Sequence, residues 1–261
     1  MTWAAVSASH LGGHHARDER PNQDAHRTVR HEYGAVIAAA DGHGHRSHPR
    51  SGIGALRAVE TVTALLDAVL PELDDVASAQ ALVRDEVGPA LVAGWRTGVE
   101  EHAEAEPFAE QEAPRSPEET WLRYGTTVLA AAANDSVVVL AQIGDGDVVV
   151  VSDTGEVWQP LPEDELLDGV RTTSLCQPDP LESLRVVALP AGQVRLVYAC
   201  TDGFGKPQLD DQWWRQVGIE LTERTAEHGA DWLAERLPGW LIEPAEVGGD
   251  DTTMAVLVAI S

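Results

Sequence analysis

The chain has 261 residues, 43% of them hydrophobic, and carries 18 basic and 43 acidic side chains for a formal net charge of −25. This length suits one large domain or two small ones, and the acidic balance argues against nucleic acid and anionic membranes as partners, because both require Lys and Arg. No apolar run approaches the roughly 18 residues of a membrane helix, and the first residues lack the basic flank and apolar run of a signal peptide. We therefore expect a soluble, cytoplasmic protein.

The first part of the chain is predicted to contain a strand and a helix. Residues 1–26 predict an irregular or short-strand opening, and the apolar run 33–40 predicts a buried strand. Apolar residues three and four apart predict an amphipathic helix over 51–70, with Ser51 as its cap and Pro71 as its stop.

A second helix is predicted from about residue 78 to residue 101, with a bend at Gly88-Pro89. The stretch 100–119 is acidic and contains three prolines, so it is predicted to be a loop.

From residue 126 onward the pattern becomes mainly β. Three short apolar runs predict a meander of antiparallel strands: 126–133, 136–143 and 147–152. Three later runs predict further strands: 184–190, 194–203 and 252–261. Between them, 155–183 is predicted to be an extended excursion and 212–237 to be helical. Strands and helices come in blocks, which favours an α+β fold with antiparallel sheets. Within the β region Cys200 is predicted to be a buried thiol, and with Cys176 it forms no metal-type pair.

Aspartates stand at the ends of the apolar runs. Four of these runs have such an acid, and a fifth aspartate lies shortly before the first strand: Asp41, Asp145, Asp202 and Asp250, with Asp24 as the fifth. Alone, "QIGDGDVV" is a good hairpin turn and "ACTDGF" a strand-ending turn. If the strands share a sheet edge, however, these carboxylates converge and repel one another unless cations neutralise them. Oxygen ligands of this kind suit Mg²⁺ or Mn²⁺.

The ordered motifs NQDA, AADGHGH, GTT, QIGDG, CTDG and GGDDTT resemble those of the metal-dependent protein phosphatases, the protein phosphatase 2C-like family, and above all its bacterial branch. The resemblance spans residues 22–253 and implies a single phosphatase domain, 1–261, with two packed antiparallel β-sheets flanked by helices. It implies hydrolysis of phosphoserine or phosphothreonine through a metal-activated water. The partners would be a phosphoprotein substrate and an opposing Ser/Thr kinase, and we expect a monomer.

The resemblance also implies roles for single residues. It assigns two Mn²⁺ or Mg²⁺ ions to a core site whose ligands, with those of a third ion, are Asp24, Asp41, the Gly42 carbonyl, Asp145, Asp202 and Asp250. Asp41 would bridge the two core ions, and Asp145 with Asp202 would hold the third, weaker ion. His43 matches a histidine assigned to general-acid help for the leaving group, and 155–183 matches a variable flap beside the site.

The sequence departs from the family pattern at two positions. Gln23 stands where many members have Glu, which could weaken one ion site. Glu19 stands where the phosphate-anchoring Arg is usual. Arg20 and Arg17 flank that position, and we expect Arg20 rather than Arg17 to anchor the phosphate.

Other functions remain open at this point. The missing anchor favours a catalytically weak phosphatase-like domain that binds phosphoproteins, whereas the complete set of five acids disfavours it. A metal-dependent nuclease would fit the acids, but the net charge of −25 argues against it. Five histidines near the motifs invite a zinc site, but none forms a helical H-x-x-x-H pair with a third ligand: His10, His14, His15, His45 and His48.

Overall fold

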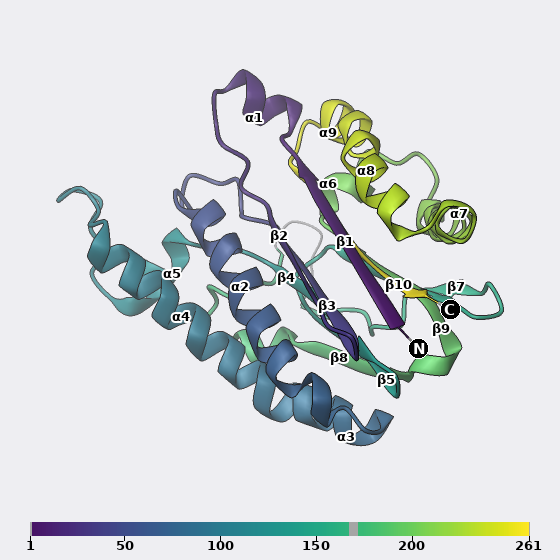
Figure 1. Cartoon of the computed structure of the whole chain (residues 1–261). Helices are drawn as coiled ribbons and strands as arrows, with labels where there is room; N and C mark the ends of the chain where they lie inside the picture. Colours follow the sequence, from purple (N-terminus) through teal and green to yellow (C-terminus); the bar gives the residue numbers. More distant parts are fainter. Residues whose placement is uncertain (1, 167–171, 261) are drawn as a thin grey trace.

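The computed structural model describes residues 2–166 and 172–260, which form two five-stranded antiparallel β-sheets packed face to face (Figure 1). Sheet A has the order β1 (Thr2–His10), β10 (Thr252–Ile260), β9 (Val194–Cys200), β6 (Asp147–Ser152) and β7 (Val157–Trp158). Sheet B has the order β2 (Ala25–Arg30), β3 (Gly34–Ala40), β4 (Val128–Asn134), β5 (Val137–Ile143) and β8 (Arg185–Pro190). The predicted α+β class is confirmed.

Helices cover the outer faces of the two sheets (Figure 1). Those over sheet B are α2 (Ser51–Val69), α3 (Val76–Leu82) and α4 (Gly88–Ala105). Those over sheet A are α7 (Trp213–His228) and α8 (Ala230–Trp240), followed by α9 (Ile242–Gly248). Three short helices lie in connections: α1 (Gly13–Arg17), α5 (Pro117–Arg123) and α6 (Asp202–Gly205). Within the described ranges, no helix combines the length and the apolar character needed to span a bilayer.

Three apolar layers hold this arrangement together, one between the sheets and one under each helical cover. Strand β3 shows why its sequence lacks polar alternation. Val36 and Ala38 face the helices over sheet B, whereas Ala35 and Ile37 face sheet A. Because both faces of the strand are covered, every position is apolar. Cys200 is buried, as predicted.

The N-terminal opening differs from the prediction, because β1 is a regular nine-residue strand paired along its whole length with β10. Helix α2 matches its predicted range, but Ser51 is not its cap. Arg50 occupies the cap position without a side-chain cap bond, and the Ser51 hydroxyl instead accepts a hydrogen bond from Gln23 Nε2 at 2.6 Å.

The second helix is interrupted in a different way from the predicted bend. A π-helical turn, Val83–Val87, joins α3 to α4, and Pro89, which has no N–H to donate back to this turn, follows it in the first turn of α4. The predicted loop 100–119 is also shorter, because α4 continues to Ala105 and α5 begins at Pro117.

The predicted three-strand meander is wrong in its last step. Strands β4 and β5 pair in sheet B, but β6 pairs with β9 in sheet A. The segment "GDG" is therefore no hairpin turn. It carries the chain from one sheet to the other, with Gly144 at a φ of 117°.

Candidate active site

The five predicted aspartates all lie at the same end of the two sheets. In sheet B, the register that pairs Ala25 with Ala40 puts Asp24 beside Asp41. In sheet A, Cys200 of β9 pairs with Asp147 of β6 on one side and with Met254 of β10 on the other. The crossover from β5 and the ends of these strands hold the other three acids: Asp145, Asp202 and Asp250.

Three of these acids form a tight cluster. Asp41, Asp145 and Asp202 each offer a carboxylate oxygen, and these oxygens lie within 4.8 Å of one another. With Asp250 they line a pocket of about 830 Å³. Across residues 2–166 and 172–260 this is the one group of His, Cys, Asp or Glu side chains with metal-site geometry, so the histidines considered for zinc do not form a second one.

The buried carboxylates of the cluster repel one another, and a bound cation would neutralise their charge. Burial raises the pKa of the Asp41 carboxyl well above its usual range, and neighbouring carboxylates raise it further. Burial also raises the pKa of Asp202, with Asp145 adding to the effect. In addition, Asp145 Oδ1 is buried and has no hydrogen-bond partner among the described residues. Because unpaired oxygens and repelling carboxylates are costly when buried, this donor set fits a hard divalent ion.

Asp24 neighbours Asp41 but is not one of the three acids whose oxygens lie within 4.8 Å of one another. Its Oδ2 accepts a hydrogen bond from Thr201 Oγ1 at 2.8 Å. Burial raises its pKa well above the usual range, while the hydroxyls of Thr253 and Thr201 oppose that rise. The Asp24 carboxylate is therefore held by threonine hydroxyls, and it is also the neighbouring charge that raises the pKa of Asp41 most.

Gly42 follows Asp41 in a very confined position. It forms a β-bridge with Thr126, and a Cβ there would lie 2.4 Å from the Gln23 carbonyl oxygen. Only glycine fits such a close backbone approach.

Lys206, the only lysine of the chain, also lines the pocket. Its ammonium forms an ion pair with Asp202 one helical turn earlier. Burial alone would lower the pKa of Lys206, but the hydrogen bond and charge of Asp202 outweigh it, so the pKa is raised. The sequence analysis did not single out this residue. A lysine four residues after Asp202 could have indicated this ion pair in the sequence, because residues four apart lie side by side on a helix.

The two candidate anchoring arginines lie in different surroundings. Arg20 Nη2 donates to Gln23 Oε1 at 2.7 Å and to the Gly44 carbonyl at 3.0 Å, so its guanidinium lies against the DGHG loop. Arg17 is exposed, and its Nε donates back to the Gly13 carbonyl of its own helix. Glu19 is exposed with a φ of 54°, the one non-glycine residue in the described ranges with positive φ.

His43 is packed between other side chains. Its ring lies edge-on to His48 with centroids 5.0 Å apart, and a Cβ on Gly125 would lie 2.8 Å from the His43 ring. Burial lowers the pKa of His43 to about 4, His48 lowers it too, and Asp145 opposes them. The ring is therefore neutral near pH 7.

Asp251 was missed by the sequence analysis. It is 3% exposed, and its carboxylate accepts hydrogen bonds from the backbone amides of Gly12 and Gln23 at 2.8 and 2.6 Å. Its Oδ2 also lies 2.8 Å from His15 Nδ1. Asp251 thus ties the N-terminal loop, which includes Arg20, to the start of β10.

The predicted flap lies beside the pocket. Thr172, Ser174, Cys176 and Gln177 line it. Ser174 ties this segment to the site, because its hydroxyl donates to the Thr126 carbonyl at 2.9 Å. Residues 167–171 of the predicted flap lie outside the described residues.

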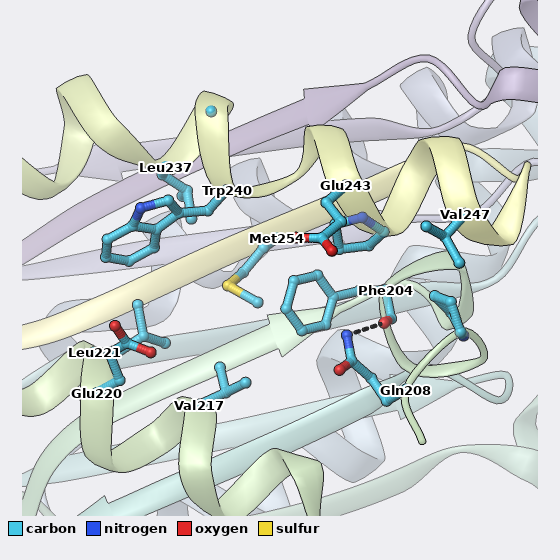
Figure 2. A pocket seen from close by; sticks show the side chains of 13 residues that line it. Phe204, Gln208, Val217, Glu220, Leu221, Leu237, Trp240, Glu243, Val247 and Met254 are labelled. Atoms are coloured by element: carbon cyan, nitrogen blue, oxygen red, sulfur yellow. Dashed lines mark hydrogen bonds between the residues drawn. The ribbon is translucent and has the colours of Figure 1, made fainter. Parts of the chain in front are cut away.

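Figure 2 shows a second pocket, of about 460 Å³. Residues of the α6 segment line both pockets. Asp202 and Lys206 line the aspartate pocket, whereas Phe204 and Pro207 line the second one. Figure 2 shows Phe204 beside Met254 in its centre. Its lining is mostly apolar and contains none of the predicted site residues. The packing of Phe204 therefore helps to hold α6, and with it Asp202, in place.

A family model described as Protein phosphatase 2C matches residues 11–241. The chain belongs to the protein phosphatase 2C family. This membership confirms the resemblance found in the motifs and supports a protein phosphatase over a phosphoprotein-binding module. A search of curated proteins gave no match.

Solved structures with the same fold include bacterial serine/threonine phosphatases. Stp1 of Staphylococcus aureus gives a TM-score of 0.66 at 14% identity, covering 100% of this chain and 96% of that chain. The S. agalactiae serine/threonine phosphatase gives 0.61 at 16% identity, covering 99% and 100%. The catalytic domain of PstP, in complex with two manganese ions, gives 0.54 at 22% identity and covers 99% of each chain. These likenesses concern the fold.

Proposed function

We propose that this protein is a metal-dependent serine/threonine phosphatase that acts on phosphoserine and phosphothreonine in proteins, with Mn²⁺ or Mg²⁺ in the aspartate pocket. The observation that carries the proposal is the buried cluster of Asp41, Asp145 and Asp202, with Asp145 Oδ1 unpartnered among the described residues, in a chain of this family. The two manganese ions bound to PstP support the choice of metal.

The ligands we propose for two core ions and a third, weaker ion are Asp24, Asp41, the Gly42 carbonyl, Asp145, Asp202 and Asp250. When bound, such ions supply a water of lowered pKa and neutralise charge on the phosphoryl oxygens. The protein contributes fixed oxygen donors, since Asp41 and Asp202 are anchored at strand ends. The neutral amide of Gln23 orients Arg20 rather than an ion.

Arg20 is proposed to hold the phosphoryl group. Its Nη2 is occupied by Gln23 and Gly44, whereas Nε and Nη1 have no partner among the described residues. Nε–H and the Nη1 N–H groups point in different directions, so each is available for a single charge-assisted bond to a phosphoryl oxygen. Arg17 bonds to its own helix and is the weaker candidate.

His43 is proposed to act at the leaving oxygen. Because its ring is neutral near pH 7, it can form a hydrogen bond there, but it carries no extra proton to give up. The general-acid role implied by the resemblance would require His43 to be protonated first, and burial opposes this.

We further propose that residues 1–261 form one phosphatase domain, and the family match over residues 11–241 supports this. Its partners would be a phosphoprotein and an opposing Ser/Thr kinase, and it would act as a cytoplasmic monomer.

The test is turnover of p-nitrophenyl phosphate and a phosphothreonine peptide with Mn²⁺ and with EDTA. We expect turnover only with the metal, and its loss in Asp41→Asn. Asp153→Asn, which makes the same change at an exposed turn, should keep full activity. Turnover that is insensitive to EDTA, or that survives in Asp41→Asn, would contradict the proposal.

A further inference from the structure

Basic and imidazole side chains gather on one side of the aspartate pocket. His45 and His48 line the pocket, and the exposed Arg46 lies between them in the sequence. Arg123 lies beside them, since the backbone amide of Arg50 donates to the Arg123 carbonyl and His48 Nδ1 pairs with the Leu122 carbonyl. We call His45, Arg46, His48 and Arg123 the basic lip.

The charges on the lip have no acidic partners of their own. Within the described ranges, the Arg46 side chain makes no hydrogen bond or ion pair, and Arg123 Nη2 donates only to the backbone carbonyl of Glu112, at 3.4 Å. Some arginines elsewhere do pair with acids, as in Arg57 with Glu60 at 2.9 Å. In a chain of net charge −25, Arg46 and Arg123 therefore place two positive charges without acidic partners on segments next to the pocket.

The electrostatic surroundings of His48 agree with a concentration of positive charge at the lip. Burial lowers its pKa, the bond to the Leu122 carbonyl opposes that, and the charges of His45 and Arg123 lower it further. The charged groups that act on this ring are all cationic. The neutral His48 ring is a hydrogen-bonding group, so the positive potential of the lip comes from the arginines.

We propose that the basic lip binds acidic residues next to the phosphorylated side chain, so that the substrates are phosphoproteins whose phosphoserine or phosphothreonine is flanked by Asp or Glu. This inference rests on the proposed function. The aspartates that line the same pocket would repel an acidic flank, so we expect such a flank to bind at the lip. Arg20 remains the proposed contact of the phosphoryl group itself.

The net charge of the chain alone leads to the opposite preference. A body of charge −25 attracts basic peptides and repels acidic ones at long range. The lip acts at short range, where exposed ion pairs each contribute about 0.2–1 kcal/mol, or up to about fivefold in an equilibrium. A measured preference for acidic flanking residues would therefore show that the lip, and not the net charge of the chain, determines the choice of substrate.

The experiment compares two phosphothreonine peptides that differ only in two flanking positions, Glu-Glu in one and Lys-Lys in the other. We expect kcat/KM with Mn²⁺ to favour the acidic peptide by about five- to tenfold at low salt. The difference should shrink in 0.5 M NaCl, because salt screens exposed pairs.

Arg46→Glu should reverse the order of the two peptides. Arg30→Glu is the matched control, because it makes the same charge change at an exposed position at the other end of β2 from Asp24, and it should keep the wild-type ratio. If the wild-type protein turns over both peptides equally, or prefers the basic one, the proposal that the lip binds acidic residues is wrong. The proposed phosphatase function would not be affected. An equal effect of both variants would also overturn the proposal for the lip. No turnover of either peptide or of p-nitrophenyl phosphate would overturn the proposed function itself.

Discussion

Asp147 carries a charge that we expect to destabilise the metal-free protein. It is the first residue of β6, and its Oδ1 accepts a hydrogen bond from Gln159 Nε2 at 2.7 Å. Burial raises its pKa to about 6, the bond from Gln159 opposes this, and the charges of Asp202 and Asp145 add to it. Asp147→Asn removes the charge and keeps an oxygen that can accept the same hydrogen bond.

The gain in stability expected from Asp147→Asn depends on pH. The unfolded carboxyl ionises near pH 4, before the folded one, so the unfolded state binds fewer protons between pH 4 and 6 and stability falls as pH rises through that window. A pKa of about 6 against the ordinary 3.8 corresponds to a penalty of about 1.5 kcal/mol at pH 5 and about 3 kcal/mol above pH 7. The substitution should remove this penalty and raise Tm by about 5 °C at pH 8.

The assay is urea unfolding of wild type and Asp147→Asn in EDTA at pH 5 and pH 8. Asp153→Asn, at an exposed turn, serves as the control and should change stability by less than about 0.5 kcal/mol at either pH. A stabilisation that is the same at both pH values, or a loss of stability, would refute the assignment of a buried, penalised charge to Asp147.

Three further predictions concern the site. Asp41→Asn should weaken Mn²⁺ binding at least about tenfold in calorimetric titration while the circular dichroism spectrum stays unchanged, because its carboxylate serves ions rather than packing. Asp145→Ala should slow turnover with little change in Tm, whereas a residue needed only for the turn would lower Tm and leave kcat per folded molecule normal. Arg20→Ala should raise KM for a phosphopeptide by about ten- to a hundredfold, since a charge-assisted pair of about 1.5–3 kcal/mol is lost. Arg17→Ala should change KM less, and the opposite order would contradict the placement of the anchor.

The strand-end acids were predictable because several local signals coincide. An apolar run buried on both faces must end where the chain leaves the core, and an Asp-Gly at that point offers both a ligand and a tight backbone. Asp41 and Asp202 both satisfy this pattern, and the structure brings them together. Their convergence comes from the packing of the two sheets, because Asp41 follows β3 of sheet B and Asp202 follows β9 of sheet A.

The crossover at Asp145 could not be predicted in the same way. The three-residue connection Gly144–Gly146 has the same local pattern whether the second strand pairs with the first or joins another sheet. The outcome depends on β9, some 50 residues later in the chain, which pairs with β6 through Asp147 and Cys200. Such a choice is made by packing between the two sheets rather than by the turn.

Asp250 and Asp251 illustrate a different limit of prediction from the sequence. They are adjacent and identical in the sequence, yet Asp250 lines the pocket while Asp251 is buried against the N-terminal loop. Successive residues approaching a strand point to opposite sides, so only one of two neighbouring acids can face the pocket. Which one does so is fixed by the register of β10 with β1, in which His10 pairs with Thr252.

The position of the phosphate anchor depends on one backbone angle. Counting residues back from Asp24 gives Glu19, which assumes that the loop has the usual conformation. Here Glu19 has a φ of 54°, in the left-handed region that non-glycine residues rarely adopt. The side chain of Glu19 is exposed, while the next residue, Arg20, reaches the Gly44 carbonyl. Since Asp251 holds the same loop through the Gly12 and Gln23 amides, the tertiary bonds of a residue more than 200 positions away stabilise the turn that selects Arg20.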